Sequence, residues 1–462
     1  MKDLFVGSPN EIIARLKNKA QSIPSWEELK KDYYSKEHKI VYDQINRRDK
    51  VRKNGIVEKA ARIHIGMEKL LTLRTNEFMF AIPVRRIYSN IEENETRQAI
   101  SKAIEAVYKH ARINAENKRR GIAYFASCEI FTLWYTVKCP NTLYGFKSEY
   151  KLKCKTFSPM EGVLLYPLFD EYDDMIAMSR QYSKTLNNQT ITYFEAFTDS
   201  KHIKWKQDGN KWEEVFNRDI IIIEKIPGAY LSRANPIWDG LSHIREDIEY
   251  TLSRNSDVIA YNSAPILQVV GALQGKENKG ESQRIYRVEL GGSVSYVSWQ
   301  QAIEALRYQI ATLNNIFWAQ GQMPDISFEQ MKSLGNIGYD ARKTLFMDAH
   351  LKVGDESGDW IEFFERESNV IKAFLKKMKM EWENEIDNVD VEHVITPFIQ
   401  DDETAEIDKW TKANGGKPIV SQLESIQGAG LSADPKQTME QIKKEAGEAA
   451  SMQIGSIMEA YK

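Results

Sequence analysis

The residues that could carry chemistry in this sequence do not fall into the spacings that known reactions need. The seven histidines are scattered and never form the i, i+4 pair with which a helix holds zinc. Gly271–Glu277 has the wrong spacing for a phosphate-binding loop, and Gly292–Ser295 lacks the closing glycine of a nucleophile elbow. We therefore predict that the protein is not an enzyme and that it binds no cofactor and no metal.

Two further groups of residues have both a structural and a functional interpretation. The acidic run Asp170–Asp174 lies between two segments of strand character, where a hairpin turn favours such residues, although carboxylates could also bind a metal. Cys128, Cys139 and Cys154 match no zinc-binding pattern, and we expect reduced thiols with structural roles. For the acidic run, the turn is the preferred interpretation.

The composition is that of a folded protein without a strong overall charge. Lys and Arg number 63 and Asp and Glu number 66, so the formal net charge is -3, whereas a protein that grips DNA electrostatically usually carries a basic excess. The length of 462 residues predicts several domains or one elongated subunit. The longest apolar run, Ile220–Ile223, is far below the ~20 residues of a membrane span, and the start of the chain lacks an apolar signal core. We expect a protein made in a cytoplasm, with no membrane partner.

Hydrophobic periodicity divides the chain into a helical first part, a strand-rich middle and a helical remainder. The first part is predicted to hold two short helices within 8–46, a helix over 57–73 and a long helix over 93–119. In the middle part, Lys151, Lys153 and Lys155 alternate with less polar residues, which places the three lysines on the solvent face of a strand. The strands predicted for this antiparallel layer cover 123–137, 150–157, 162–169, 175–182, 191–197 and 220–225.

Two helices with a single apolar stripe flank a small β-rich insert. The first should begin at Asn235–Pro236, because Asn is a favoured N-cap and Pro a favoured first helical residue, and should extend to 262. The insert covers 263–299, with turns at 275–280 and 291–292, and the second helix covers 300–320. The stripe residues that should pack these helices are Ile237, Leu241, Ile244, Ile248, Ile303, Leu306, Ile310, Leu313 and Phe317.

The remainder of the chain is predicted to be a loop followed by helices. The loop covers 321–339, and a long helical region over about 340–385 should be interrupted or kinked at Gly354–Asp359. From 401 onward we expect short polar helices joined by glycine-rich turns. The predicted fold class is therefore α+β.

Several short segments, in the same order along the chain, resemble the portal proteins of tailed bacteriophages, in the branch found in long-tailed siphoviruses. The resemblance covers nearly the whole chain, and the order of the segments carries it. Ala81–Ile82 replaces a glycine that is usual in the family, and Ile337 stands where serine is common. The segments are Asp32–Ile40, Lys53–Val57, Glu77–Val84, Ile223–Asn235, Met323–Ser327, Leu334–Ala341, Gly416–Ser421, Leu431–Pro435 and Glu440–Glu445.

The resemblance implies a phage portal fold with an α/β wing, a two-helix stem, a small β-rich clip, a long kinked helix and a helical C-terminal crown. The implied parts are the wing (1–234), the stem helices (235–262 and 300–320), the clip (263–299), the tunnel loop (321–339), the long helix with a return to the wing (340–400), and the crown (401–462). Within the tunnel loop, the residues expected to face a DNA channel are Met323, Pro324, Asp325, Ser327, Glu329, Lys332 and Asn336.

The function that the resemblance implies is a dodecameric ring at one capsid vertex of a virion, assembled in the host cytoplasm. This ring would be the channel for DNA packaging and ejection. The expected partners are other copies of the chain, double-stranded DNA that passes without sequence specificity, a terminase, a head-tail adaptor, the major capsid protein and a scaffold. The alternative is a non-portal oligomeric scaffold or adaptor protein of a virion.

The charges of the stem and the clip leave two interpretations open. An acidic stem suits DNA that must not stick, but ordinary solvated helix faces explain the same residues, namely Asp239, Glu246, Asp247, Glu249 and Asp257 against Arg245 and Arg254. The clip is slightly basic, which permits contact with DNA or an adaptor, while a solvated hairpin tip is the simpler interpretation. The clip residues that would make this contact are Lys276, Lys279, Arg284 and Arg287.

Overall fold

The computed structural model divides the chain into two compact units. The first unit comprises 1–325 together with 348–398, and the second comprises 326–347 together with 399–462. The residues that the structure describes are 4–18, 22–51, 53–91, 94–186, 188–219, 223–262, 266–279, 283–297, 303–325, 344, 346–398, 403–415, 418–430, 432 and 434–460.

Short helices open the chain at the caps that the sequence predicts. Helix α1 (Pro9–Leu16) follows Ser8, which forms a capping box with Glu11, and α2 (Trp26–Tyr33) follows Ser25. A helix predicted over 57–73 is wrong in its first part, because residues 57–58 pair as a strand and the helix begins only at Met67. The elements after α2 are η1 (Ser35–Glu37), α3 (Lys39–Tyr42), β1 (Lys50–Val51), β2 (Val57–Glu58) and α4 (Met67–Phe80).

The long helix predicted over 93–119 is in fact two helices. Asn94 caps α5 (Glu95–Ala111) by accepting hydrogen bonds from the Thr96 and Arg97 amides. Arg112 then has a left-handed backbone with φ of 56°, so it ends α5 and starts α6 (Ile113–Ser127) in a new direction. The strand predicted over 123–137 is therefore wrong at its start, since residues 123–127 complete α6.

The predicted antiparallel strands form separate sheets rather than one layer. One sheet has the order β11-β4-β5, another is a five-stranded meander in the order β10-β9-β8-β7-β6, and β3 pairs with β16. Residues 223–225 form a turn, not the predicted strand, and residues 220–222 lie outside the described residues. The bounds are β3 (Arg85–Ser89), β4 (Glu129–Asn141), β5 (Ser148–Phe157), η2 (Pro159–Glu161), β6 (Leu164–Phe169), β7 (Met175–Leu186), β8 (Gln189–Phe197), β9 (Lys201–Asp208), β10 (Lys211–Asp219), β11 (Gly228–Ser232) and β16 (Asp390–Val394).

The five-stranded sheet buries side chains on both faces. On one face, Ile13 and Leu16 of α1 pack against Phe194 and Trp205. On the other face, the sheet contributes to a core that it shares with Phe131 and other residues of the β11-β4-β5 sheet. The strands β9 and β10 were not predicted, because charged residues on their exposed positions obscure the alternation of buried residues such as Ile203 and Trp205.

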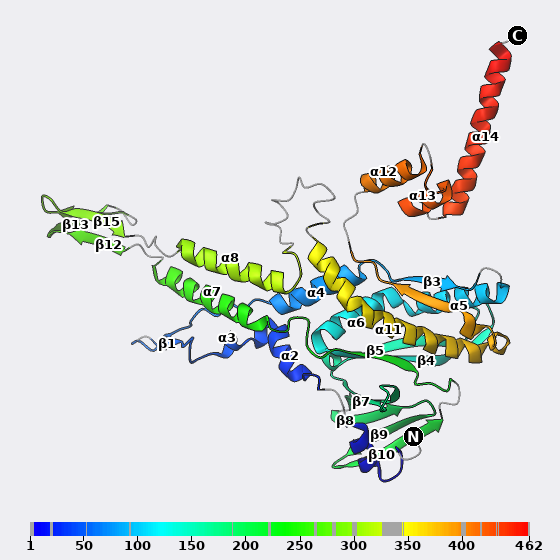
Figure 1. Cartoon of the computed structure of the whole chain (residues 1–462). Coiled ribbons are helices and arrows are strands. Elements are labelled where there is room, and N and C mark those ends of the chain that lie inside the picture. Colours follow the sequence, from blue (N-terminus) through cyan, green and yellow to red (C-terminus); the bar gives the residue numbers. More distant parts are fainter. Residues whose placement is uncertain are drawn as a thin grey trace. The chain divides into compact units, whose positions relative to one another are not determined.

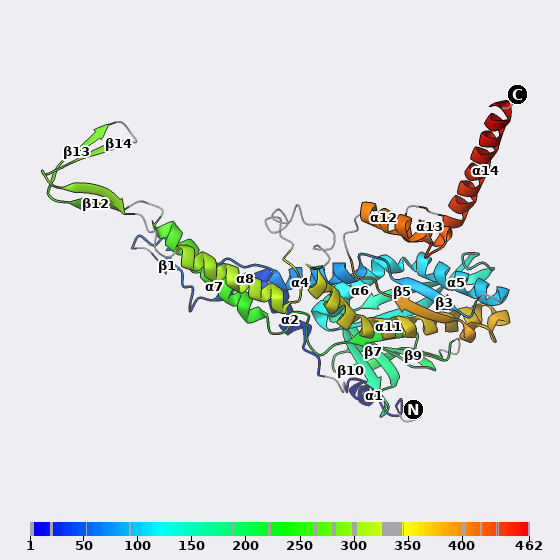
Figure 2. The ribbon, with the colours of Figure 1, turned by 45° about the horizontal axis from the view of Figure 1, so that its top comes forward.

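Helix α11 (Met347–Met378) spans the position where an interruption was predicted. Its helical turns continue through Gly354 and Gly358, so the predicted interruption is wrong, although the ribbon bends in both views (Figures 1 and 2). Its buried face includes Glu367, whose Oε1 accepts a hydrogen bond of 3.0 Å from Arg120 and one of 3.0 Å from the Trp134 indole. An ion pair is thus buried inside this core. Short 3-10 helices follow at η3 (Met380–Trp382) and η4 (Ile386–Asn388).

Two long helices lie side by side and flank a small β-rich insert, as predicted (Figures 1 and 2). The first helix starts later than expected, because residues 236–241 form turns and Gly240 has φ of 75°, a conformation that interrupts a helix. In the insert, the predicted turn at 275–280 is wrong for residues 275–279, which are in a strand, whereas the turn at 291–292 is present. The elements are α7 (Ser242–Asn262), β12 (Ile266–Val270), β13 (Leu273–Lys279), β14 (Gln283–Val288), β15 (Ser293–Val297) and α8 (Ile303–Gln320).

The second unit is helical in the part that the structure describes. Ser421 forms a capping box with Glu424 at the start of α13 (Gln422–Ala429), and Gly430 with φ of 69° ends that helix. The third helix of this unit, α14 (Pro435–Ala460), is longer than the short helices that the sequence predicts. Helix α12 (Glu403–Asn414) precedes α13.

Candidate functional site

The α7–α8 hairpin is the structure's candidate functional element, and its predicted stripe packs unevenly. Ile244 and Ile248 of α7 are buried, as are Ile237 and Leu241 in the turns before it. Along α8, Leu306, Ile310 and Leu313 are only half-buried, while Phe317 near its C-terminal end is fully buried. The side chain of Ile303 lies outside the described part. The hairpin is therefore fixed at its base and increasingly exposed away from it.

A network of buried charges fixes the base of α7. The Arg245 guanidinium donates to Glu68 at 2.8 Å, to Glu249 at 3.2 Å and to Asp32 at 2.8 Å. Arg245, Glu68 and Glu249 are each at most 1% exposed, and burial raises the pKa of Glu68 while Arg245 opposes that effect. Charges buried this deeply are tolerated only when they are paired, so α7 cannot detach from α4 and α2 without a large cost in free energy.

A histidine extends this network toward the N-terminal segment. His38 Nδ1 lies 2.6 Å from Glu249 Oε1, and its Nε2 lies 2.8 Å from the Asp32 carbonyl oxygen. Both partners are oxygen atoms, so each ring nitrogen of His38 has a hydrogen-bond partner. The Ile65 amide donates to the same Glu249 oxygen at 2.8 Å. Glu249 thus joins three segments of the chain.

One row of α7 side chains holds an arm formed by residues 43–63. Glu249, Ser253 and Asp257 recur every fourth residue and share a face of the helix. The Ser253 hydroxyl accepts from the Ile63 amide at 2.8 Å, and Asp257 accepts from the Ala61 amide at 2.9 Å. Arg47, which is 6% exposed, bonds Asp257 and donates to the carbonyls of Ala61 and Ser253. These bonds fix the arm along α7.

The C-terminal end of α8 is held by an aromatic and cationic anchor. Arg74 of α4 stacks over the Trp318 ring at 4.1 Å, donates to the Pro324 carbonyl at 3.0 Å and lies 3.7 Å from Asp325. Lys352 of α11 donates to the Gly321 carbonyl at 2.6 Å, which places a cation at the negative end of the helix dipole. Burial lowers the pKa of Lys352 to about 8. The start of the predicted tunnel loop is thus part of this anchor.

The structure describes three of the seven residues predicted for the tunnel loop. Met323 is buried, Pro324 contacts Arg74 through its carbonyl, and Asp325 accepts a hydrogen bond from Asn314 at 3.3 Å. Ser327, Glu329, Lys332 and Asn336 lie outside the described residues. A role in a channel remains a prediction for all seven.

The outward face of α8 carries no charge beyond its start, where Glu304 and Arg307 are exposed. Residues at steps of three and four fall on the side away from the packed stripe, and Tyr308 is 75% exposed there. The uncharged residues on this side are Ala305, Tyr308, Thr312, Asn315, Ile316 and Ala319. The arm exposes further apolar side chains, among them Ile45, Val51, Ile56 and Val57. Exposed apolar groups that gather on fixed elements are typical of surfaces that meet another protein chain.

Residues 15–452 match the protein family described as "Phage portal protein, SPP1 Gp6-like". The chain belongs to this phage portal family. A solved structure described as "Virion of native gene transfer agent (GTA) particle" matches with 10% identity and a TM-score of 0.39, over 92% of this chain and 99% of that one. A second, "Neck of empty GTA particle computed with C6 symmetry", matches with 11% identity and a TM-score of 0.36, over 79% and 89%. No curated protein sequence matches the chain. The sequence match alone therefore carries the family assignment.

Several of the charges counted in the predicted stem helix 235–262 are not free on the surface. Three of the seven charged residues counted between 235 and 262 do not face open solvent as free charges, because Arg245 and Glu249 are buried and Asp257 holds Arg47. The exposed charges on α7 include Asp247 and Arg254. The surface of residues 235–262 is accordingly less acidic than a count of its charged residues indicates.

For the four residues of the predicted clip contact, the structure describes the backbone but not the side chains. Lys276 and Lys279 are in β13, and Arg284 and Arg287 are in β14, the strand paired with it in antiparallel register. Their side chains lie outside the described part of the chain. Contact of these residues with DNA or an adaptor stays a prediction.

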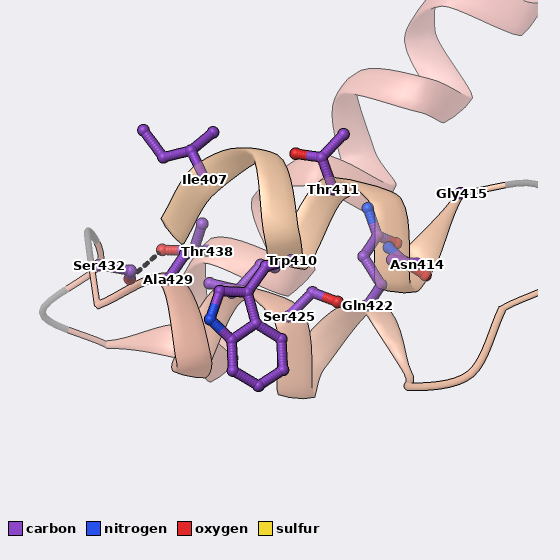
Figure 3. A pocket seen from close by; sticks show the side chains of 11 residues that line it. Ile407, Trp410, Thr411, Asn414, Gly415, Gln422, Ser425, Ala429, Ser432 and Thr438 are labelled. Atoms are coloured by element: carbon purple, nitrogen blue, oxygen red, sulfur yellow. Dashed lines mark hydrogen bonds between the residues drawn. The ribbon is translucent and has the colours of Figure 1, made fainter. Parts of the chain in front are cut away.

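A cavity of about 610 Å³ lies within the second unit, between α12, α13 and the start of α14 (Figure 3). A Cβ at Gly428 would lie 2.3 Å from the Trp410 ring, so only glycine allows this approach of the two helices. The Ser425 hydroxyl is buried and has no hydrogen-bond partner among the described residues. None of the lining residues is ionisable, so the cavity offers apolar surface and hydroxyl groups rather than charge.

The acidic run and the three cysteines can be located in the structure. Asp170–Asp174 is a hairpin turn in which the Asp170 side chain accepts from the amides of Tyr172 and Asp174, both at 2.9 Å, so the turn interpretation is confirmed. No disulfide joins Cys128, Cys139 and Cys154. Within the described ranges, we find no group of three or more potential ligands placed to hold a metal, and no helix long and apolar enough to cross a bilayer.

Sequence reasoning missed the residues that fix α7. Asp32 and His38 carry part of the family resemblance, yet their role as partners of α7 was not predicted. The available signal was the pair Arg245 and Glu249 at i, i+4, but on most helices such a pair is solvated. The burial that changes its meaning comes from segments about 200 residues away in the sequence.

Proposed function

We propose that this portal-family chain forms a closed ring at one capsid vertex and that DNA passes through the ring during packaging and ejection. The family match over residues 15–452 carries the proposal. It is supported by the hairpin, because α7 is fixed by buried charges while α8 and the arm expose uncharged and apolar side chains suited to neighbouring copies. A head-to-tail contact that closes by rotation produces a ring.

The dimensions of a ring built from such hairpins suit DNA. If about twelve copies each place one helix around an axis at a spacing of ~8–10 Å, the helix axes lie on a circle about 30–38 Å across. Subtracting one helix diameter of ~10 Å leaves an opening of about 20–28 Å. An opening of this size admits a duplex without requiring sequence-specific contacts.

The partners of this ring follow from its proposed position. Terminase would dock during packaging and a head-tail adaptor afterwards, and the major capsid protein and scaffold would surround the wing. The insert between α7 and α8, with β12 to β15, is the part we assign to adaptor or motor contact. The loop after α8 is the part we assign to the channel.

Native mass spectrometry and negative-stain imaging of the purified chain test the ring. We expect a closed assembly of about a dozen subunits with an axial hole. A dimer or a filament without a hole would contradict the ring and favour an oligomeric scaffold. Deletion of residues 325–335 should leave assembly intact but impair DNA packaging or retention, and normally filled heads from this variant would contradict the channel assignment.

A further inference from the structure

One surface of the first unit gathers lysines from two sheets. On β5, Lys151, Lys153 and Lys155 share a face with Phe157, while the intervening Leu152 is buried on the other side. The cross-strand partners of these lysines on β4 are Val137, Tyr135 and Leu133. On the five-stranded sheet, Lys184 and Lys204 lie in line with Arg180, Tyr182 and Tyr193. We call Lys151, Lys153, Lys155, Lys184 and Lys204 the lysine face.

The two parts of the lysine face turn toward each other. The Arg180 guanidinium of β7 lies 3.8 Å from the centre of the Phe157 ring at the end of β5. Phe157 and Met178, one from each sheet, belong to the same buried core. The lysines therefore continue outward from this shared core, on the facing sides of two adjoining sheets.

Lysines outnumber acids on this surface, where Glu149 precedes Lys151 on the same face of β5 and Glu213 pairs with Lys206 beside Tyr193. In the described part of the chain, none of the five lysines of the lysine face forms an ion pair. Glu195, the acid in line with Lys204, is almost completely buried and bonds Arg180 and His202 instead. At the margin, burial raises the pKa of Glu161, and Lys155 partly opposes that effect. Lysines are therefore in excess on this surface, although the net charge of the chain is -3.

Aromatic rings hold several of these ammonium groups in place. Tyr182 and Tyr193 stack with their centres 5.6 Å apart, and Lys204 lies 4.6 Å from the Tyr193 centre. Lys184 lies 5.7 Å from Tyr182, and Lys155 lies 5.3 Å from Phe157. Cation–π contacts of this kind restrict long side chains before any ligand binds, which lowers the entropy lost on binding.

We propose that the lysine face binds the phosphate backbone of duplex DNA, without sequence specificity, at a site separate from the axial channel. Successive lysines on one face of β5 are ~6.6 Å apart, about twice the 3.4 Å rise per phosphate along one DNA strand. A row of evenly spaced lysines, of which Lys155 is held against Phe157, suits a ligand of uniform charge. The proposal rests on the portal role for its source of DNA, but it does not require the ring to be closed.

A covalently closed circular duplex tests the proposal, because a closed circle cannot thread through an assembled ring. Its affinity for the full chain is measured by fluorescence anisotropy over a series of salt concentrations. We expect Lys151→Ser/Lys153→Ser to lower the affinity at least about tenfold and to make the log–log salt dependence shallower by about 2. Lys151→Arg/Lys153→Arg should retain most of the binding.

The matched control is Lys102→Ser/Lys109→Ser, which removes the same charge from exposed positions on α5 and should bind like the unmodified chain. Equal loss in both double variants would overturn the lysine face, as would binding of linear DNA alone. Binding of poly-glutamate but not of the circle would assign the face to an acidic protein and overturn the DNA proposal. Native mass spectrometry of each variant separates these outcomes from a failure of ring assembly.

Discussion

The two helices of the hairpin are similar in length but are held by opposite kinds of chemistry. Helix α7 is fixed by the buried charges of Arg245 and Glu249, which bond segments close to the N-terminus. Helix α8 is fixed by Phe317 and Trp318 near its C-terminal end, and its exposed positions after Arg307 carry no charge. The difference suggests a division of roles: α7 sets the position of the hairpin in the subunit, and α8 is the helix that we propose to contact a neighbouring copy.

Removing the central charge of α7 should give the largest effect on stability. Arg245→Leu leaves the carboxylates of Glu68 and Glu249 buried without their partner, so we expect a loss of about 3–5 kcal/mol in the free energy of unfolding. Chemical denaturation measures this loss. Arg254→Leu, an exposed arginine on the same helix, is the control and should change stability by no more than about 0.5 kcal/mol. Similar losses in both variants would show that α7 is not fixed by the network.

The contact of Lys352 with the end of α8 should make the free energy of unfolding depend on pH. The pKa of Lys352 in the folded chain is about 8, below its ordinary 10.5, so the unfolded chain binds more protons between these values. Stability should therefore rise by about 3 kcal/mol as the pH increases from 8 to 10.5. Lys352→Met should remove this rise, whereas Lys102→Met on exposed α5 should keep it. A pH profile unchanged in Lys352→Met would show that this lysine is not buried against the end of α8.

The attachment of the arm to α7 should have an intermediate effect. Asp257→Ala removes the acceptor of the Ala61 amide and one partner of Arg47, with an expected cost of about 1–2 kcal/mol. Hydrogen exchange should show faster exchange at the Ala61 amide, while the Leu152 amide in β5 should keep its protection. Unchanged exchange at Ala61 would contradict the fixed arm.

A charge on the outward face of α8 should have the smallest effect on the subunit and a large effect on assembly. Tyr308→Asp should change the stability of the monomer by no more than about 0.5 kcal/mol, because the side chain is exposed. In a ring, the same carboxylate would be buried without a partner, so native mass spectra should show mainly monomer. His243→Asp on the exposed side of α7 is the control and should still assemble. Normal rings from Tyr308→Asp would remove α8 from the interface.

Local rules predicted many elements of the fold. Spacing at three and four residues identified both hairpin helices, Ser8 and Ser25 marked the first helix starts, and strict alternation placed Lys151 and Lys153 on an exposed face. The same rules failed where one backbone angle decides the outcome, as at Arg112 and Gly240. They also failed for strands β9 and β10, whose exposed faces are densely charged.

The charge network at the base of α7 could not be predicted because its partners are distant in the sequence. Arg245 and Glu249 look like a solvated pair until Asp32, His38 and Glu68 surround them. Asp325 in the predicted tunnel loop likewise gains its place from Arg74, which is far away in the sequence. For the clip lysines and arginines, and for Ser327 to Asn336, the channel and contact roles remain predictions.

The buried network also determines how late in translation this part of the subunit can fold. Asp32 and His38 leave the ribosome 213 and 211 residues before Arg245 and Glu249, the partners that neutralise and bond them. At ~5–20 residues per second, that interval lasts roughly 10–40 s. During this time Asp32 and His38 lack their partners on α7. The charge network at the base of α7 therefore cannot form before more than half of the chain has been translated.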